Sequence, residues 1–128
     1  MKTIQITIAV CILAMLFTSC VQEEHQKDIT ITLDMNGVEI KGEVGVRGQF
    51  LESNWQTTIP MKDTNGDGIY ELVITDKTAK NSVEFKFVNG KDYELKGAEN
   101  RMISFEYLPE TISYQAIFNN PNAKQITK

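Results

Sequence analysis

Short apolar runs that alternate with polar residues dominate the chain from residue 29 onward. In residues 83–87, one Val and two Phe alternate with Glu and Lys, which is the two-residue period of a strand with one buried face. Runs of the same kind cover 29–34, 44–50, 69–74, 101–107 and 112–118. No segment after Cys20 shows a capped helical stripe, so the pattern predicts an all-β domain.

Turn signals separate these runs. Asn36-Gly37, Asn89-Gly90 and Lys96-Gly97 are typical of tight turns, as are the Asp-rich and Asn-rich segments 63–68 and 119–121. Val38 and Ile40 continue the alternation after the first of these turns. Short strands separated by turns predict an antiparallel β-sandwich.

The first twenty residues follow a different pattern. Lys2 precedes an apolar stretch over 4–17, and the small residues Thr18 and Ser19 come directly before Cys20. The stretch is shorter than the roughly 20 apolar residues that a membrane-spanning helix needs. It resembles a bacterial lipoprotein signal, which implies cleavage before Cys20 and lipid attachment to that cysteine. Plain secretion, with cleavage near Ser19 and a free thiol at Cys20, is the alternative.

The sequence therefore predicts four segments. Residues 1–19 form the signal peptide and 20–28 a polar, lipidated tether. Residues 29–107 form an immunoglobulin-like sandwich, and 108–128 form a last strand and a frayed tail. Because Cys11 leaves with the signal, no disulfide is expected, and the core alone must stabilise the single domain.

Charge and residue content argue against several functions. The net charge of −4 lacks the basic surface that nucleic-acid binding requires. The single histidine, His25, lies in the expected tether, so a serine or cysteine nucleophile has no base. None of the 17 acidic residues is paired by its spacing, and phosphate loops and metal-type cysteine pairs are absent from the sequence. We expect a protein that is not an enzyme and needs no cofactor.

Asp63, Asn65 and Asp67 match the first half of an EF-hand calcium loop. The twelfth position, where such a loop supplies a bidentate Glu, is Ile74, and the flanking residues have a strand pattern. Asp, Asn and Gly also form tight turns for local reasons. We favour the turn and keep calcium as a weak alternative.

Two aromatic residues lie in polar, turn-rich segments. Trp55 is the only tryptophan, and Ser, Asn, Gln and Thr surround it, which makes complete burial less favourable. Tyr93 follows the Asn89-Gly90 turn. Aromatic faces flanked by amides and a lysine suit a sugar ring, whose C–H face stacks on the aromatic while its hydroxyls bind polar groups. A core position for Trp55 is the alternative.

An ordered series of short motifs resembles starch- and glycogen-binding modules of carbohydrate-binding module families 20 and 48, which include the glycogen-binding domain of AMP-activated protein kinase. The series covers about residues 29–107. Its members are Val46-Arg47-Gly48-Gln49-Phe50, Asn54-Trp55, Pro60-Met61, Asp67-Gly68-Ile69-Tyr70, residues 83–90, Tyr93-Glu94 and Glu99-Asn100-Arg101. The resemblance implies an immunoglobulin-like sandwich that binds α-glucan.

The same resemblance implies four sugar-binding residues. Trp55 and Tyr93 would stack on glucose, and Lys86 and Asn100 would contact hydroxyls. Such families usually have a second tryptophan where this chain has Tyr93. The alternative is a solvated outward position for Lys86, a turn for Asn100 and an edge charge for Arg101.

The sequence thus predicts a monomeric, non-catalytic α-glucan-binding module in the bacterial cell envelope, at the outer membrane or cell surface. Its lipid anchor would be its only membrane contact, and we expect no nucleic-acid partner. The rival hypothesis is a structural or protein-interaction sandwich, accessory to an envelope hydrolase, that has lost sugar binding.

Overall fold

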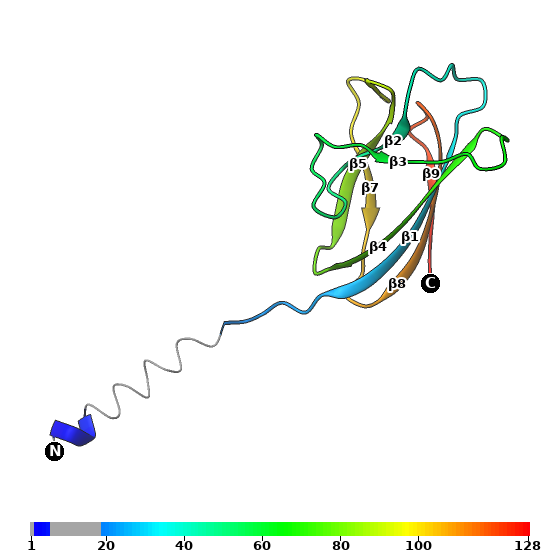
Figure 1. The fold of residues 1–128 in the computed structure, drawn as a ribbon. Helices are drawn as coiled ribbons and strands as arrows, with labels where there is room; N and C mark the ends of the chain where they lie inside the picture. Colours follow the sequence, from blue (N-terminus) through cyan, green and yellow to red (C-terminus); the bar gives the residue numbers. More distant parts are fainter. Residues whose placement is uncertain (1, 6–18) are drawn as a thin grey trace.

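The chain folds into two β-sheets that face each other (Figure 1). This computed structural model describes residues 2–5 and 19–128, so most of the expected signal peptide lies outside the described residues. The first sheet has the order β4-β1-β8-β9, and the second has the order β3-β2-β5-β6, with β7 also paired to β5. The strands are β1 (His25–Asp34), β2 (Val44–Gly48), β3 (Ile59–Pro60), β4 (Ile69–Thr78), β5 (Ser82–Asn89), β6 (Asp92–Tyr93), β7 (Arg101–Ser104), β8 (Glu110–Ile117) and β9 (Ala123–Thr127). The predicted all-β sandwich is confirmed.

The core fills the space between the two sheets. Ile29, Ile31 and Leu33 of β1 are at most 1% exposed, and they alternate with Thr and Asp side chains on the outer face. Phe85 of β5 is fully buried. Its ring lies 5.1 Å from that of Phe50, 5.4 Å from that of Phe87 and 5.3 Å from that of Tyr114, which β8 of the first sheet contributes. These aromatic contacts join the two layers.

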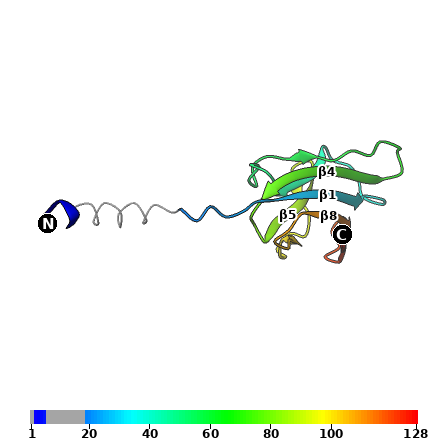
Figure 2. The same cartoon turned by 90° about the horizontal axis from the view of Figure 1, so that it is seen from below.

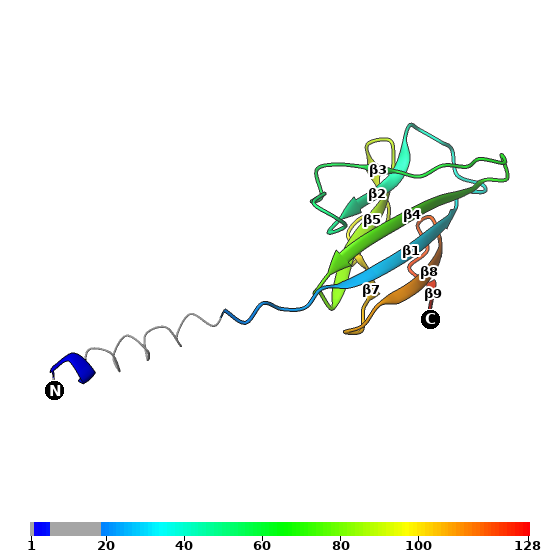
Figure 3. The same ribbon diagram turned by 60° about the horizontal axis from the view of Figure 1, so that its bottom comes forward.

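Strand β1 occupies the middle of its sheet. It pairs with β4 in antiparallel orientation and with β8 in parallel orientation (Figure 2). Among the described strands, β1 and β8 form the one parallel pair in the predicted antiparallel sandwich. A parallel partner must be reached by a crossover connection. Here the chain forms β4 and all the strands of the second sheet between β1 and β8 (Figure 3).

The strand pattern at Val38 and Ile40 does not form a strand. Both hydrogen-bonding edges of β1 are already occupied, by β4 and β8, so a hairpin partner after Asn36-Gly37 has no edge to join. Instead the chain crosses to the second sheet. The amide of Asn89 holds the crossing segment, accepting from the Lys41 N–H and donating to the Glu39 carbonyl, both at 2.8 Å.

The folded region begins earlier than predicted. Strand β1 starts at His25, within the expected tether over 20–28. Lys27 is 1% exposed, and its Nζ donates to the Glu106 and Leu108 carbonyls at 2.7 and 2.6 Å and pairs with the carboxylate of Glu110. A charged residue in a polar segment is expected to be exposed to solvent. Lys27 is buried instead, because partners from distant segments satisfy its charge and its hydrogen bonds.

The C-terminal segment is also more ordered than predicted. In place of a last strand and a frayed tail, residues 108–128 form β8 and β9, which pair with each other. Thr111 and Lys128 exchange backbone hydrogen bonds of 3.0 and 2.9 Å. The Gln125 side chain reaches across to the carbonyl of Ser104 on β7 at 3.0 Å. This contact joins the two sheets along one side.

Cys20 is exposed, with a free thiol, five residues before the start of β1. Among residues 2–5 and 19–128, no helix has the length and apolar character that crossing a membrane requires.

Candidate functional site

Trp55 lies in the loop over residues 49–58, which connects β2 to β3. Phe50 at the start of the loop packs into the core, whereas residues 51–58 are largely polar and lie at the surface, where a hydrogen bond of 3.0 Å from the Ser53 hydroxyl to the Thr57 carbonyl closes them. The Trp55 side chain is half-buried and does not belong to the hydrophobic core. The alternative in which Trp55 is a core residue is therefore wrong.

Tyr93 comes from β6, which pairs with the end of β5. It is half-buried, and its hydroxyl donates a hydrogen bond of 2.9 Å to the backbone carbonyl of Trp55. The structure thus brings together two aromatic residues that are 38 positions apart in the chain. The bond fixes the Trp55 loop against the second sheet.

Arg47 completes this corner, and sequence reasoning assigned it no role. Its Nε donates to the Thr58 hydroxyl at 2.8 Å, an Nη donates to the Tyr93 hydroxyl at 3.3 Å, and the guanidinium lies 5.6 Å from the centre of the Tyr93 ring. The strand pattern of β2 could have revealed it. Val44 and Val46 face the core, so Arg47 must face outward, on the side that carries Tyr93.

Lys86 is not a solvated outward residue, because it is only 9% exposed. Its Nζ donates to the carbonyls of Leu95 and Ala98 at 2.8 and 3.0 Å. Leu95 has a left-handed backbone with φ of 48°. Its N–H donates a hydrogen bond of 2.8 Å to the side-chain oxygen of Asn119. Lys86 therefore holds the loop after β6 in place through these hydrogen bonds. Its predicted contact with sugar stays a prediction.

Asn100 lies in the exposed segment before β7 and borders a hollow that Glu84, Glu99 and Met102 also line. Asn100 also lines a second hollow together with Arg101, Tyr114 and Gln125, and neither Trp55 nor Tyr93 lines either of the two. Its predicted role in binding sugar stays a prediction.

Arg101 is not an edge charge, because it is 4% exposed and bound to Glu94. Its Nε lies 2.5 Å from one carboxylate oxygen and an Nη lies 2.9 Å from the other. Desolvation lowers the pKa of Arg101, but its hydrogen bond to Glu94 and the charge of that carboxylate outweigh it, so the net pKa is raised. The pair is structural: both side chains are buried, and Glu94 directly follows Tyr93, the last residue of β6.

The calcium candidates form a turn. The Asp63 carboxylate accepts backbone N–H groups of Gly66, Asp67 and Gly68 at 2.8, 3.2 and 2.9 Å. Asn65 donates to the Asp67 carboxylate at 3.1 Å. In the part of the chain that the structure describes, no group of three or more His, Cys, Asp or Glu residues could hold a metal ion. These contacts agree with the local turn that the sequence analysis favours.

Comparison with family models and with curated proteins gives no significant match for this chain. Solved structures that resemble it include the CBM25-1 and CBM25-2 modules of a β/α-amylase from Paenibacillus polymyxa. The first is 15% identical with a TM-score of 0.49, covering 80% of this chain and 93% of the module. The second is 13% identical with a TM-score of 0.48, covering 81% of this chain and 94% of the module. Both carry the family number 25, whereas the motifs in the sequence resemble families 20 and 48.

The corner formed by Trp55, Tyr93, Arg47 and Thr58 offers two kinds of contact. The exposed parts of the aromatic side chains can stack on an apolar face, and the guanidinium and hydroxyl groups around them can bind oxygen atoms. A ligand with alternating apolar and hydroxylated surfaces fits both.

Proposed function

We propose that this protein is a non-catalytic, lipid-anchored module that binds α-glucan at the bacterial cell envelope, with Trp55 and Tyr93 as its stacking platform. The observation that carries the proposal is the 2.9 Å hydrogen bond from the Tyr93 hydroxyl to the Trp55 carbonyl. It holds two half-buried aromatic residues from separate segments in one arrangement before any ligand arrives. Such preorganisation lowers the entropy cost of binding.

The expected affinity is modest. Aromatic stacking contributes about 1–3 kcal/mol per ring, by analogy with bases stacked on aromatic side chains. Sugar hydroxyls exchange hydrogen bonds with water for hydrogen bonds with protein at little net gain. Two rings together supply about 2–6 kcal/mol, which corresponds to dissociation constants from tens of micromolar to tens of millimolar. An anchored module that gathers a polymer with many repeating units needs no tighter single site.

The anchor forms the second part of the proposal. Cys20 is exposed, and four residues lie between it and His25, where β1 begins. The five steps from Cys20 to His25 span at most about 18 Å when extended, at roughly 3.3–3.6 Å per residue. A lipid on Cys20 would therefore keep the sandwich close to the membrane surface. Incorporation of labelled palmitate into the protein, and its loss in Cys20→Ser, would test the attachment.

The decisive experiment compares Trp55→Ala with the unaltered protein on gels containing amylose or glycogen. We expect retention to be lost, because stacking on the indole is removed, while the melting temperature changes by no more than a few degrees. Tyr107→Ala is the matched control, since Tyr107 is 56% exposed and belongs to neither the platform nor the core. Equal retention of Trp55→Ala and the unaltered protein would remove Trp55 from the site.

The rival function, a protein-interaction sandwich, predicts a different result on the same columns. Without sugar binding, the unaltered protein would elute from amylose as it does from an inert resin.

Lower thermal stability in the presence of a chelator would instead point to calcium at Asp63, Asn65 and Asp67.

A further inference from the structure

The end of the sandwich at which the chain enters from Cys20 carries an exposed apolar pair. This tether end consists of the start of β1, the turn over residues 79–81 and the loop over residues 105–109 (Figure 1). Tyr107 and Leu108 in that loop are 56% and 45% exposed. The rings of Tyr107 and of His25, the first residue of β1, meet edge to face, with 4.5 Å between their centres. The apolar pair therefore lies beside the point where the folded domain begins.

Buried polar contacts hold the loop in place. Lys27 Nζ donates to the Glu106 and Leu108 carbonyls at 2.7 and 2.6 Å. The Glu106 N–H donates to the Glu110 carboxylate at 3.1 Å, and Pro109 has no N–H that needs a partner. Because these backbone groups are satisfied within the protein, the loop can enter a region of low water content at less cost than a loop whose backbone depends on water.

A lipid on Cys20 would bring the membrane surface to this loop. The extended chain between Cys20 and His25 spans at most about 18 Å, at roughly 3.3–3.6 Å per residue, and His25 contacts Tyr107. Tyrosine suits the boundary between water and lipid, because its ring is apolar and its hydroxyl is polar. Leucine gains free energy there by leaving water. A bilayer held by Cys20 is therefore within reach of side chains that favour contact with it.

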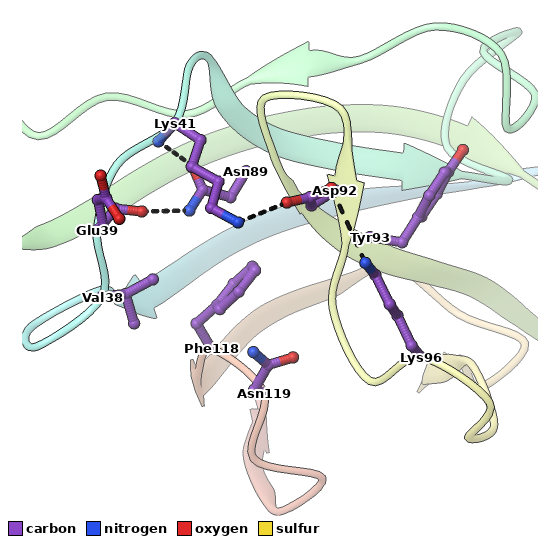
Figure 4. Close-up of a pocket in the computed structure, with 9 residues that line it drawn as sticks. All are labelled: Val38, Glu39, Lys41, Asn89, Asp92, Tyr93, Lys96, Phe118 and Asn119. Carbon is purple, nitrogen blue, oxygen red and sulfur yellow. Dashed lines mark hydrogen bonds and ion pairs between the residues drawn. The ribbon is translucent and has the colours of Figure 1, made fainter.

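The opposite end of the sandwich is charged. Lys41 and Asp92 form an ion pair of 2.8 Å, with side chains 57% and 41% exposed, and Lys96 lies 3.9 Å from the same carboxylate (Figure 4). Asp92 pairs with Asn89, the last residue of β5, whereas β5 begins directly after the turn at the tether end. Contact with lipid would remove water from these charges, which is costly. The tether end is therefore the end that suits a membrane surface.

The exposed charges at the tether end are of both signs. Lys77 and Lys80 are exposed at the end of β4 and in the turn that follows, and Glu106 is exposed in the loop. Glu23 and Glu24 precede β1 and are exposed as well. Attraction to anionic headgroups is therefore not what would hold this end on a membrane. The contact depends on the apolar pair, so a zwitterionic surface is sufficient.

We infer that Tyr107 and Leu108 insert among the lipid headgroups, so that the anchored sandwich rests on the membrane by its tether end. This inference rests on the anchoring part of the proposed function. Two side chains bind a membrane weakly by themselves, but a short link to the lipid gives them a high effective concentration at its surface. The platform then lies away from the membrane, because Tyr93 pairs with Val88, about 20 Å along β5 from Ser82 at about 3.3 Å per residue.

The test uses the lipidated protein in phosphatidylcholine vesicles that contain a lipid with a nitroxide on its headgroup. A fluorophore on Asn81→Cys reports the approach of the tether end, because the Asn81 carbonyl accepts the Phe105 N–H at 2.7 Å, next to the loop. The added cysteine is labelled selectively, since the thiol of Cys20 carries the lipid. Introducing Tyr107→Ser/Leu108→Ser should abolish most of the nitroxide quenching. High salt should not, because it screens charges only.

Val73→Ser/Ile117→Ser is the matched control. It removes two side chains that are 64% and 49% exposed, in the middle of β4 and at the last residue of β8, and should leave the quenching unchanged. We expect both double variants to melt as the unaltered protein does, because none of the four side chains belongs to the core.

The outcomes separate the docking from the proposed function. Equal quenching with and without Tyr107→Ser/Leu108→Ser would overturn the docking, as would equal losses in the two double variants. Crosslinked dimers that form on the vesicles and disappear in the same variant would also overturn it, in favour of a second copy of the chain. Absence of palmitate on Cys20 would overturn the anchor and the docking with it. Failure to bind α-glucan would overturn the sugar-binding part of the proposed function and leave the docking intact.

Discussion

At the residue scale, the candidate site depends on a few polar contacts that hold aromatic side chains in place. Tyr93 has a polar end that binds the Trp55 carbonyl and Arg47, and a ring that Arg47 approaches at 5.6 Å. A tyrosine can therefore contribute both a stacking surface and a fixed position, whereas a tryptophan at this point could not make the same hydroxyl contact. The tyrosine at this position, where the resembling families usually have a tryptophan, therefore makes two hydrogen bonds through a hydroxyl that a tryptophan lacks.

Tyr93→Phe should weaken α-glucan binding although the ring remains. Loss of the hydroxyl frees the Trp55 loop and removes about 1 kcal/mol of hydrogen bonding, so we expect affinity for maltoheptaose to fall several-fold. Titration calorimetry measures the change. Tyr107→Phe, at an exposed tyrosine outside the platform, should bind as the unaltered protein does. Unchanged affinity of Tyr93→Phe would show that the hydroxyl does not position the site.

Lys41→Ala should raise the pKa of Asp92 toward its ordinary value. The hydrogen bond and charge of Lys41, and then the charge of Lys96, hold that pKa below its usual range. Because the folded pKa is depressed, the stabilisation from the pair is present above the ordinary carboxyl pKa and is lost as pH falls through the lowered value. NMR titration of the Asp92 carboxyl measures the shift. Lys96→Ala should raise this pKa less, and a larger rise there would contradict the assignment.

At the element scale, strand β1 determines where the domain begins. Its first residues lie next to β8 in parallel register, with Lys27 opposite Glu110. The side chains of this pair are 1% and 2% exposed. Burial of two charges is costly unless both are paired and hydrogen-bonded, and here two carbonyls and one N–H complete the network.

Lys27→Met should destabilise the domain by about 3–5 kcal/mol, because the carboxylate of Glu110 is left buried without its partner. Adding Glu110→Leu to this variant should recover much of the loss, since the buried charge is then removed as well. Urea denaturation of the two variants measures both effects. Lys124→Met, on the exposed strand β9, is the control and should leave the midpoint unchanged. Additive losses in the double variant would show that the two residues act independently.

At the scale of the whole molecule, hydrogen bonds from one buried ion pair and shared aromatic contacts join the two sheets. The Arg101 guanidinium of β7 binds Glu94, which directly follows β6, and donates to the carbonyls of Ile117 at the end of β8 and of Asn120, at 3.1 and 2.6 Å. The Glu94 carboxylate also accepts the N–H groups of Phe87 and Asn119. This network fixes the turn after β8 against β5 and β6.

Glu94→Gln should lower the free energy of unfolding by about 3–5 kcal/mol although the side chain keeps its size, because an amide donor replaces an oxygen that accepts hydrogen bonds and Arg101 loses its counter-charge. Thermal and urea denaturation measure the loss. Glu99→Gln makes the same chemical change at an exposed position in the following loop and should have little effect. Equal stability of the two variants would contradict the role of the network.

The sequence alone determined the strand-rich architecture, because a period of two between turn residues has no stable alternative when one face must be buried. It also singled out Trp55 and Tyr93, since aromatic residues in polar loops stand out by composition. Only the tertiary structure decided where β1 begins, that 36–40 forms no hairpin, and that Lys27, Lys86 and Arg101 are held by partners far along the chain. The reason is that a local pattern reports which residues prefer water, whereas the burial of a charged group and the free edge of a strand depend on partners that only the folded chain brings near.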